Sequence, residues 1–339
     1  MSSAGAEASE VTLGQSGEPE TAGDLKPPGS GRQPKDFWKQ SGRAQAKVNL
    51  SLKVLGKRAD GYHELFGLMA RLDLADEITV SPSDSSGDIL TYRGLEPGSF
   101  DNGFTGTSNL ALRAVRLYRQ LTGWPPQSVA IDLVKKIPLG SGLGGGSSDA
   151  AAVLRLLNQS ELMAPERLAA VAVSLGGDVP FFLEDGPLRL AGGIGELLRP
   201  YRGKLPGRWL LLINPGFHLS TAVVFKQLGL TTWESSSNSL FSVEGIEGCS
   251  GDDRTPELGE NDLFRPASEL RPELLKISRL LTRLIPAPLA AGLSGSGPTF
   301  WALFREDFEA EEAQANFERL IGNGSVFGSG WWLRVTTIA

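Results

Sequence analysis

The feature that most constrains this chain is a glycine-rich run between a strand pattern and a helix pattern. Five of the seven residues from Gly140 to Gly146 are glycine, and Ser147 and Ser148 follow. Glycine adopts positive φ without strain, so successive backbone N–H groups can converge on the oxygens of a phosphate. The positive end of the helix that begins near Ser147 points at the same anion. Each glycine loses much backbone entropy on folding, and a plain turn does not need five of them. The run therefore predicts a phosphate-binding loop.

Two other nucleotide-binding designs fit the spacing of these glycines formally. Gly140, Gly142 and Gly145 satisfy the dinucleotide fingerprint G-x-G-x-x-G. That fingerprint closes a βαβ unit near a domain start, whereas here at least two strands and a helix precede the loop and Pro138 separates it from its strand. The Walker A frame places Gly146 where the phosphate-binding lysine is required, which excludes a P-loop ATPase. A dinucleotide-binding oxidoreductase stays the less favoured alternative.

Composition and charge exclude several classes of protein. A formal net charge of -6 argues against binding to nucleic acid through broad charge attraction. Cys249 is the only cysteine and His63 and His218 are the only histidines, so neither an internal disulfide nor a Cys/His zinc site can form. No uninterrupted apolar stretch approaches the roughly 18 residues that cross a bilayer, and the N-terminal residues contain neither a basic leader nor an apolar signal core. We expect a cytoplasmic protein with no nucleic-acid or membrane partner.

The order of apolar residues predicts a mixture of strands and helices. Residues 44–54 alternate strictly between apolar and polar, which predicts a strand with one buried face and with Lys47 and Asn49 side by side on the other. Further strands are predicted at residues 73–81, 129–135, 298–304 and 331–338, and helices at 108–121, 148–157, 165–175, 220–228 and 272–284. No regular βαβ repeat links them, so we expect an α+β fold built of two α/β sandwiches.

Two segments lie outside this pattern. Residues 1–36 are rich in Gly, Ser, Pro and Glu and contain hardly any large apolar residues, so a disordered tail is predicted. Residues 231–260 are rich in Ser, Gly and Asp and are expected to form a surface insertion. Neither segment carries a recognisable functional motif.

A single carboxylate follows a pair of glycines at the end of a predicted helix. Asp178 stands after Gly176 and Gly177 and before an apolar, strand-like segment, where we expect it to be partly buried. An aspartate in such a place is as often a capping or turn residue as a functional one. The three sequence blocks described next favour the functional role over the structural one.

Three blocks of the sequence together resemble the GHMP kinase superfamily, and within it the kinases whose acceptor is a cytidine diphosphate derivative of methylerythritol. The blocks are residues 46–50 (AKVNL) with 58–65 (RADGYHEL), residues 142–152 (GLGGGSSDAAA) and residues 175–181 (LGGDVPF). Supporting matches are Asn109-Leu110, Pro215-Gly216 with Ser220-Thr221, residues 261–263 and residues 294–297. The matches run in order from about residue 43 to the C-terminus.

The resemblance implies a fold, a reaction and two catalytic residues. It implies an N-terminal ATP and substrate domain at residues 37–195 and a C-terminal α/β sandwich at residues 196–339. The implied reaction is ATP-dependent phosphorylation of the 2-hydroxyl of 4-diphosphocytidyl-2-C-methyl-D-erythritol, with Mg²⁺ to neutralise phosphate charge. Asp178 would orient and deprotonate the hydroxyl, and Lys47 would keep Asp178 ionised and stabilise the transferring group.

The same resemblance assigns the remaining site residues but neither magnesium ligands nor an oligomeric state. Asn49 would contact the polyol, Tyr62 and His63 would hold the cytosine base, and Thr221 and Phe225 would complete the substrate side. The residues on the ATP side would be Asn109, Lys135, Pro138, Gly140, Gly142, Leu143, Gly144, Gly145, Gly146, Ser147 and Ser148. His218 is expected to be structural.

Two further interpretations stay open beside this one. Another GHMP member, such as homoserine kinase, mevalonate kinase or diphosphomevalonate decarboxylase, would share the loop but give Tyr62 and His63 no base to bind. A non-catalytic sensor with the same fold would bind ATP or sugar without turnover, and it would be expected to lack the reactive pair that Lys47 and Asp178 supply.

Overall fold

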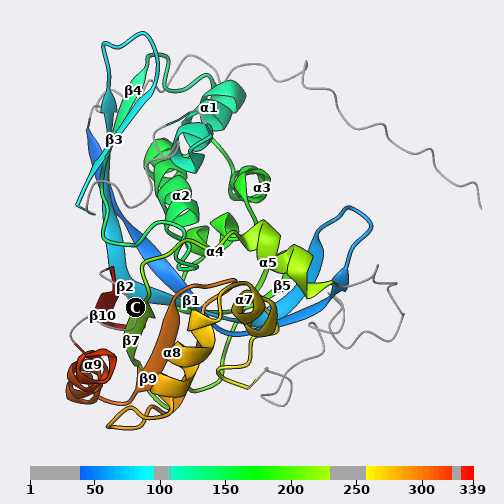
Figure 1. The fold of residues 1–339 in the computed structure, drawn as a ribbon. Helices are drawn as coiled ribbons and strands as arrows, with labels where there is room; N and C mark the ends of the chain where they lie inside the picture. Colours follow the sequence, from blue (N-terminus) through cyan, green and yellow to red (C-terminus); the bar gives the residue numbers. More distant parts are fainter. Residues whose placement is uncertain (1–38, 95–105, 107, 230–256, 323–329) are drawn as a thin grey trace, which may run out of the picture. The chain divides into compact units, whose positions relative to one another are not determined.

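Two β-sheets form the framework of the protein (Figure 1). The computed structural model describes residues 39–94, 106, 108–229, 257–322 and 330–339, which belong to one compact unit at residues 34–339. The predicted tail and nearly all of the predicted insertion lie outside the described residues.

The first sheet is built around a long antiparallel pair, β1 (Gln40–Lys57) and β2 (His63–Pro82). The other edge of β2 pairs with β5 (Leu188–Gly193) along its first half and with β4 (Val129–Val134) along its second half. The sheet is completed by β3 (Ile89–Arg93), which is parallel to β4, and by β6 (Leu197–Pro200), which pairs with β5. Lys47, Asn49 and His63 lie on this sheet, and the glycine loop follows β4.

Helices cover one face of the first sheet (Figure 1). They are α1 (Leu110–Thr122), α2 (Gly145–Leu157), α3 (Pro165–Leu175) and α4 (Val179–Leu183), with a single 3-10 turn at Asn158–Ser160. Their apolar faces form one core with the sheet, in which Tyr118, Val153 and Phe181 are fully buried. This core fixes α2, and with it the end of the glycine loop, against β1 and β2.

The second sheet has the strand order β10-β7-β9-β8. Its strands are β7 (Trp209–Asn214), β8 (Ala290–Leu293), β9 (Phe300–Phe304) and β10 (Trp332–Thr337). Its core is shared with α5 (Thr221–Leu228), α7 (Phe264–Leu270), α8 (Glu273–Leu281) and α9 (Asp307–Ile321).

A third apolar core joins the two sheets face to face. Ala46, Val48 and Leu50 of β1 pack with Leu212 of β7 and Trp301 of β9, all fully buried. The indole Nε1 of Trp301 also donates to the backbone oxygen of Asn49 at 2.9 Å. The layers therefore run helices, sheet, sheet, helices, which confirms the predicted α+β class. The predicted division at residue 195/196 stays a prediction; it falls in the turn between the paired strands β5 and β6.

The expectation of one buried face on the first strand is wrong. Lys47, Asn49 and Ser51 are all less than a tenth exposed. The glycine loop and Asp178 lie against Lys47, and the turn at residues 294–297 lies against Asn49. The register with β2 shifts between Gln45 and Lys47, so the regular alternation of faces is interrupted there. Ala44 consequently joins the helix-covered core while Ala46 joins the core between the sheets.

Two other expectations about elements are wrong, and helix α9 is among the elements that were not predicted. The apolar segment after Asp178 is the short helix α4 and not a strand, because Pro180 is in its first turn, where proline favours a helix start. Strand β2 begins at His63 rather than near Asp73, since its first half is buried on both faces and shows no alternation. Helix α9 escaped prediction although Glu306 and Glu309 form a capping box at its start.

Candidate active site

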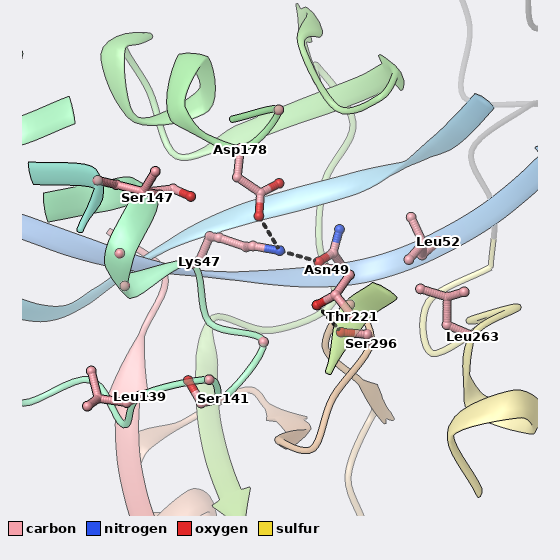
Figure 2. Close-up of a pocket in the computed structure, with 18 of the residues that line it drawn as sticks. Lys47, Asn49, Leu52, Leu139, Ser141, Ser147, Asp178, Thr221, Leu263 and Ser296 are labelled. Carbon is pink, nitrogen blue, oxygen red and sulfur yellow. Dashed lines mark hydrogen bonds and ion pairs between the residues drawn. The ribbon is translucent and has the colours of Figure 1, made fainter. Parts of the chain in front are cut away.

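A cavity of about 420 Å³ lies where the helix-covered face of β1 meets the glycine loop. Figure 2 shows that Lys47 and Asn49 point from β1 toward Asp178 and toward the start of α5. The loop at residues 138–147 and the turn at residues 295–296 form further parts of the wall. Segments far apart in the sequence thus enclose one space, and of the residues predicted for the site Lys47, Asn49, Asp178, Thr221, Phe225 and most of the loop line it.

Lys47 and Asp178 form an ion pair at this cavity. The Lys47 ammonium lies 3.3 Å from Asp178 Oδ2 and donates a hydrogen bond of 2.6 Å to Asn49 Oδ1 (Figure 2). The Lys47 side chain is 5% exposed while that of Asp178 is 37% exposed, so the lysine is held and the carboxylate is open to the cavity. The backbone N–H of Lys47 donates to Leu143 O at 2.9 Å and ties β1 to the glycine loop.

Asp178 is positioned by the helix that it begins. It is the N-cap residue of α4, and Arg71 of β2 holds the other end of that helix by donating to Phe181 O at 2.7 Å and Glu184 O at 2.6 Å. Arg71 is the residue of β2 that pairs with Lys47 across the sheet. Burial, together with the neighbouring arginines 155 and 189, lowers the pKa of Arg71 to about 10, which leaves it charged at neutral pH. The strand pair therefore fixes both members of the ion pair.

The glycine loop has the backbone that the sequence predicted. Gly140, Gly142 and Gly144 have φ values of 59°, 79° and 72°, in the left-handed region that favours glycine. A Cβ at Gly142 would lie 2.5 Å from Ser294 O, and one at Gly144 would lie 2.9 Å from Lys47 Cγ. The first N–H groups of a helix have no intrahelical acceptors. Helix α2 begins at Gly145 with no side-chain cap and no acidic residue in its first turn, so no capping side chain occupies these groups. The N–H groups of this first turn lie at the cavity wall and can donate hydrogen bonds to an anion.

The predicted ATP-side residues occupy different places. Those that line the cavity are Lys135, Pro138, Gly140, Gly142, Gly144, Gly145, Gly146 and Ser147. Leu143 and Ser148 are buried and do not form part of its wall. Asn109 caps α1 by accepting from the backbone N–H of Ala111 at 2.8 Å. The ammonium of Lys135 is turned inward to two buried aspartates.

A second cavity, of about 610 Å³, adjoins the first and is aromatic. Tyr62, His63 and Phe225 line it, and Thr221 and Phe225 belong to the walls of both cavities. The rings of His63 and Phe225 are stacked with centroids 4.7 Å apart, and Tyr62 is 60% exposed at the edge. Burial, and then the charge of Lys57, lower the pKa of His63, so its imidazole is neutral at neutral pH. The predicted base-binding residues are therefore together and next to the ion pair.

The turn at residues 294–297 is the part of the site that the sequence assignment missed. Ser296 Oγ lies 2.8 Å from Thr221 Oγ1 at the cavity wall (Figure 2). Ser294 Oγ donates to Gly142 O at 2.9 Å and accepts from the backbone N–H of Asn49 at 3.2 Å. The Ser-Gly-Ser-Gly motif was the available signal, but its pattern alone did not say that it lies against the glycine loop.

The described residues contain no cluster of metal-ligating side chains outside this site. No group of three or more His, Cys, Asp or Glu side chains there could hold a metal ion, and Asp178 is the only carboxylate in the wall of the first cavity. His218 packs against the backbone of Gly140, where a Cβ would lie 2.2 Å from its ring. None of the described helices is both long and apolar enough to cross a membrane.

Known proteins share the fold and match long parts of the sequence. Two family models match the chain: GHMP kinases N terminal domain at residues 109–186 and GHMP kinases C terminal at residues 254–322. A crystal structure of 4-(cytidine 5'-diphospho)-2C-methyl-D-erythritol kinase superposes with a TM-score of 0.62 at 34% identity, covering 88% of this chain and 99% of that one. Homoserine kinase from Cytophaga hutchinsonii superposes with a TM-score of 0.60 at 20% identity, covering 91% of this chain and 96% of that one, which shows the fold alone. Fold and site thus define a GHMP kinase.

Curated relatives narrow the class further. The 4-diphosphocytidyl-2-C-methyl-D-erythritol kinase of Citrifermentans bemidjiense is 41% identical over 82% of this chain and 94% of its own length. The enzyme of the same name from Pelobacter propionicus is 40% identical over 86% of this chain and 96% of its own. The chain belongs to the 4-diphosphocytidyl-2-C-methyl-D-erythritol kinase family of GHMP kinases. The resemblance seen in the motifs is confirmed, and the dinucleotide-binding alternative is wrong.

Proposed function

We propose that this chain transfers the γ-phosphoryl group of ATP to the 2-hydroxyl of 4-diphosphocytidyl-2-C-methyl-D-erythritol, a step of the non-mevalonate route to isoprenoid precursors. One observation carries the proposal for this chain's own residues. The ion pair of Lys47 and Asp178 lies in a cavity that has the glycine loop on one side and an aromatic cavity on the other. The glycine loop, the ion pair and the aromatic cavity thus lie in the order expected for the donor phosphate, the reacting hydroxyl and the nucleobase of the acceptor.

The reaction needs a base, an orienting group and charge neutralisation. A bond forms between the acceptor oxygen and the γ-phosphorus while the bond from that phosphorus to the β–γ bridging oxygen breaks. The proton of the hydroxyl passes to the carboxylate of Asp178, which is the exposed member of its ion pair. Lys47 favours the ionised form of Asp178 and offsets negative charge that develops on the phosphoryl oxygens. Asn49 accepts from Lys47 through Oδ1, so its Nδ2 group is the end that donates to the polyol.

The donor side is assigned to the loop and to the first turn of α2. The loop and the first turn of α2 fit a polyphosphate because they offer backbone N–H groups and the first turn contains no acidic residue. We assign Asn109 and Lys135 to the nucleoside end of ATP, following the family motif. Magnesium would be held chiefly by ATP oxygens, with the Ser147 hydroxyl as a protein group within the cavity, and it would neutralise phosphate charge.

The acceptor side is assigned to the aromatic cavity. The cytosine base would stack between Tyr62 and Phe225, and a neutral His63 can donate one hydrogen bond and accept another. Thr221 lies between the two cavities and would contact the linking part of the substrate. We also propose that the two domains divide at residue 195/196 and that the protein is cytoplasmic.

The test is ADP release by the full chain with ATP, magnesium and each of three acceptors. We expect turnover with 4-diphosphocytidyl-2-C-methyl-D-erythritol and none with mevalonate or homoserine. Turnover with only mevalonate or homoserine would assign another GHMP activity. ATP binding without ADP release for any of the three acceptors would favour the non-catalytic sensor, against which the retained pair of Lys47 and Asp178 argues.

A further inference from the structure

Three charged side chains are buried together beneath the glycine loop, and the chemistry above uses only one of them. Lys135, Asp76 and Asp149 are 1%, 0% and 2% exposed. The Lys135 ammonium contacts Asp76 Oδ2 and lies 2.8 Å from Asp149 Oδ2. Asp76 and Asp149 do not line the cavity, so neither carboxylate is placed to touch a substrate.

This cluster holds the chain at both ends of the loop. Asp76 Oδ1 accepts from the backbone N–H of Lys136 at 2.6 Å and of Ile137 at 2.9 Å, directly before the loop. Asp149 is in the second turn of α2, directly after the loop. Lys135 bridges the two carboxylates and so connects the entry of the loop to its exit.

The ammonium of Lys135 also lies under the first turn of α2. A Cβ added at Gly145 would be 3.5 Å from Lys135 Nζ. The cation is therefore placed directly behind the N–H groups that face the cavity. Its position depends on the two aspartates, because a buried lysine without partners would lose its charge.

The cluster is costly for stability alone, which points to a positional role. Two carboxylates compete for one ammonium, and Asp149 Oδ1 is buried without a hydrogen-bond partner. Burial, with repulsion from Asp76, raises the pKa of Asp149 to about 7 although Lys135 opposes the shift. Apolar side chains of similar volume often stabilise a fold as well as such a group does.

We propose that Asp76 is a positioning residue for the phosphate-binding loop: with Lys135 and Asp149 it fixes both ends of the loop, so that the N–H groups between them are aimed at ATP. The proposal rests on the kinase function proposed above. Asp76 belongs to β2, far from the glycine motif in sequence, and so no pattern in the loop itself indicates it.

The test compares Asp76→Asn with the control Asp88→Asn. Asp76 holds the backbone just after the C-terminal end of β4, and Asp88 holds the backbone at the N-terminal end of β4. Asp88 Oδ1 accepts from the backbone N–H of Val129 at 3.0 Å, at the start of β4, and pairs with Arg119 at 2.8 Å. Its side chain is 6% exposed, so Asp88→Asn also removes a buried carboxylate that holds β4. The two variants differ in which end of β4 they release.

The measurement is calorimetric titration of each full-length variant with MgATP, with the melting temperature recorded beside it. Asp76→Asn should weaken ATP binding by about tenfold or more, because misplacing binding groups by about 1 Å costs up to a hundredfold. Its KM for the acceptor should stay within about twofold. Asp88→Asn should lose a similar amount of thermal stability and bind ATP as the wild type does.

Equal ATP affinity in Asp76→Asn and wild type, or equal weakening in both variants, would overturn the proposal. If Asp76→Asn does not fold, Asp149→Asn provides the same test from the other end of the loop, with the same expected weakening. Failure of the wild type to bind MgATP would instead refute the kinase function. The two failures are therefore distinguishable.

Discussion

Gly144 is the position where a single methyl group most directly tests the geometry of the site. Its φ of 72° is in the left-handed region, and it is the N-cap residue of α2. A Cβ there would lie 2.9 Å from both Lys47 Cγ and Phe182 Cζ, and 3.2 Å from Lys47 Cε. Both side chains are 4% exposed and cannot simply move into solvent. The substitution Gly144→Ala therefore perturbs the backbone and Lys47 together.

The two effects can be separated with a matched glycine. Gly123 closes α1 with the same φ of 72°, and a Cβ there would meet nothing within 4 Å. Gly123→Ala should cost only the left-handed conformation of an alanine, roughly 1–2 kcal/mol in the free energy of unfolding. Gly144→Ala should cost that and roughly 1–3 kcal/mol more for overpacking. The expected total is about 2–5 kcal/mol.

The assay is urea unfolding of both variants followed by steady-state kinetics. If the added methyl moves the Lys47 ammonium by about 1 Å from Asp178, kcat should fall by up to about a hundredfold. Gly123→Ala should keep the wild-type kcat because it is remote from the cavity. Equal losses of stability in the two variants, together with an unchanged kcat in Gly144→Ala, would refute the reasoning.

Three other changes separate the parts of the site. Asp178→Asn should lower kcat by about 10²- to 10⁴-fold while MgATP binding, followed by calorimetry, stays within about twofold; near-normal turnover would mean that the base is misassigned. Phe225→Ala should raise the KM of the acceptor by about 5- to 150-fold, because stacking of a base is worth about 1–3 kcal/mol, and an unchanged acceptor KM would contradict the assigned base site. The pKa of Asp149 is raised to about 7 in the folded protein from an ordinary value of 3.8, so its contribution to stability is present at low pH and is lost as the pH rises through about 7. Melting temperatures from about pH 5 to about pH 8 should therefore fall less in Asp149→Asn than in the wild type, and parallel curves would exclude the shift.

Local chemistry explains which parts of the site could be predicted from the sequence. The positive φ values of Gly140, Gly142 and Gly144 follow from the spacing of the glycines. The strand that carries Lys47 follows from the alternation of its neighbours, and the end of α3 just before Asp178 follows from the glycines there. Each of these signals lies within a few residues of the feature that it predicts.

Contacts between distant segments decided the rest. The glycine loop and Asp178 bury Lys47 on a face that the alternation indicated as open. Pro180 favours a helix after Asp178, but packing within the helix-covered core and Arg71 at the end of α4 fix where that helix holds Asp178. Ser296 reaches the cavity only because the turn that carries it lies beside Asn49 and the glycine loop.

The sequence by itself determined the chemical groups: a loop for phosphate, a carboxylate and an ammonium for transfer, and aromatic rings for a base. Only the tertiary structure decided that Lys47 and Asp178 are 3.3 Å apart, that Arg71 holds the helix behind Asp178, and that Asp76 supports the loop from another strand. The physical reason is that residue type sets what a group can do, whereas distance and burial set its charge and its partners. Those two quantities arise when the sheets and helices pack together.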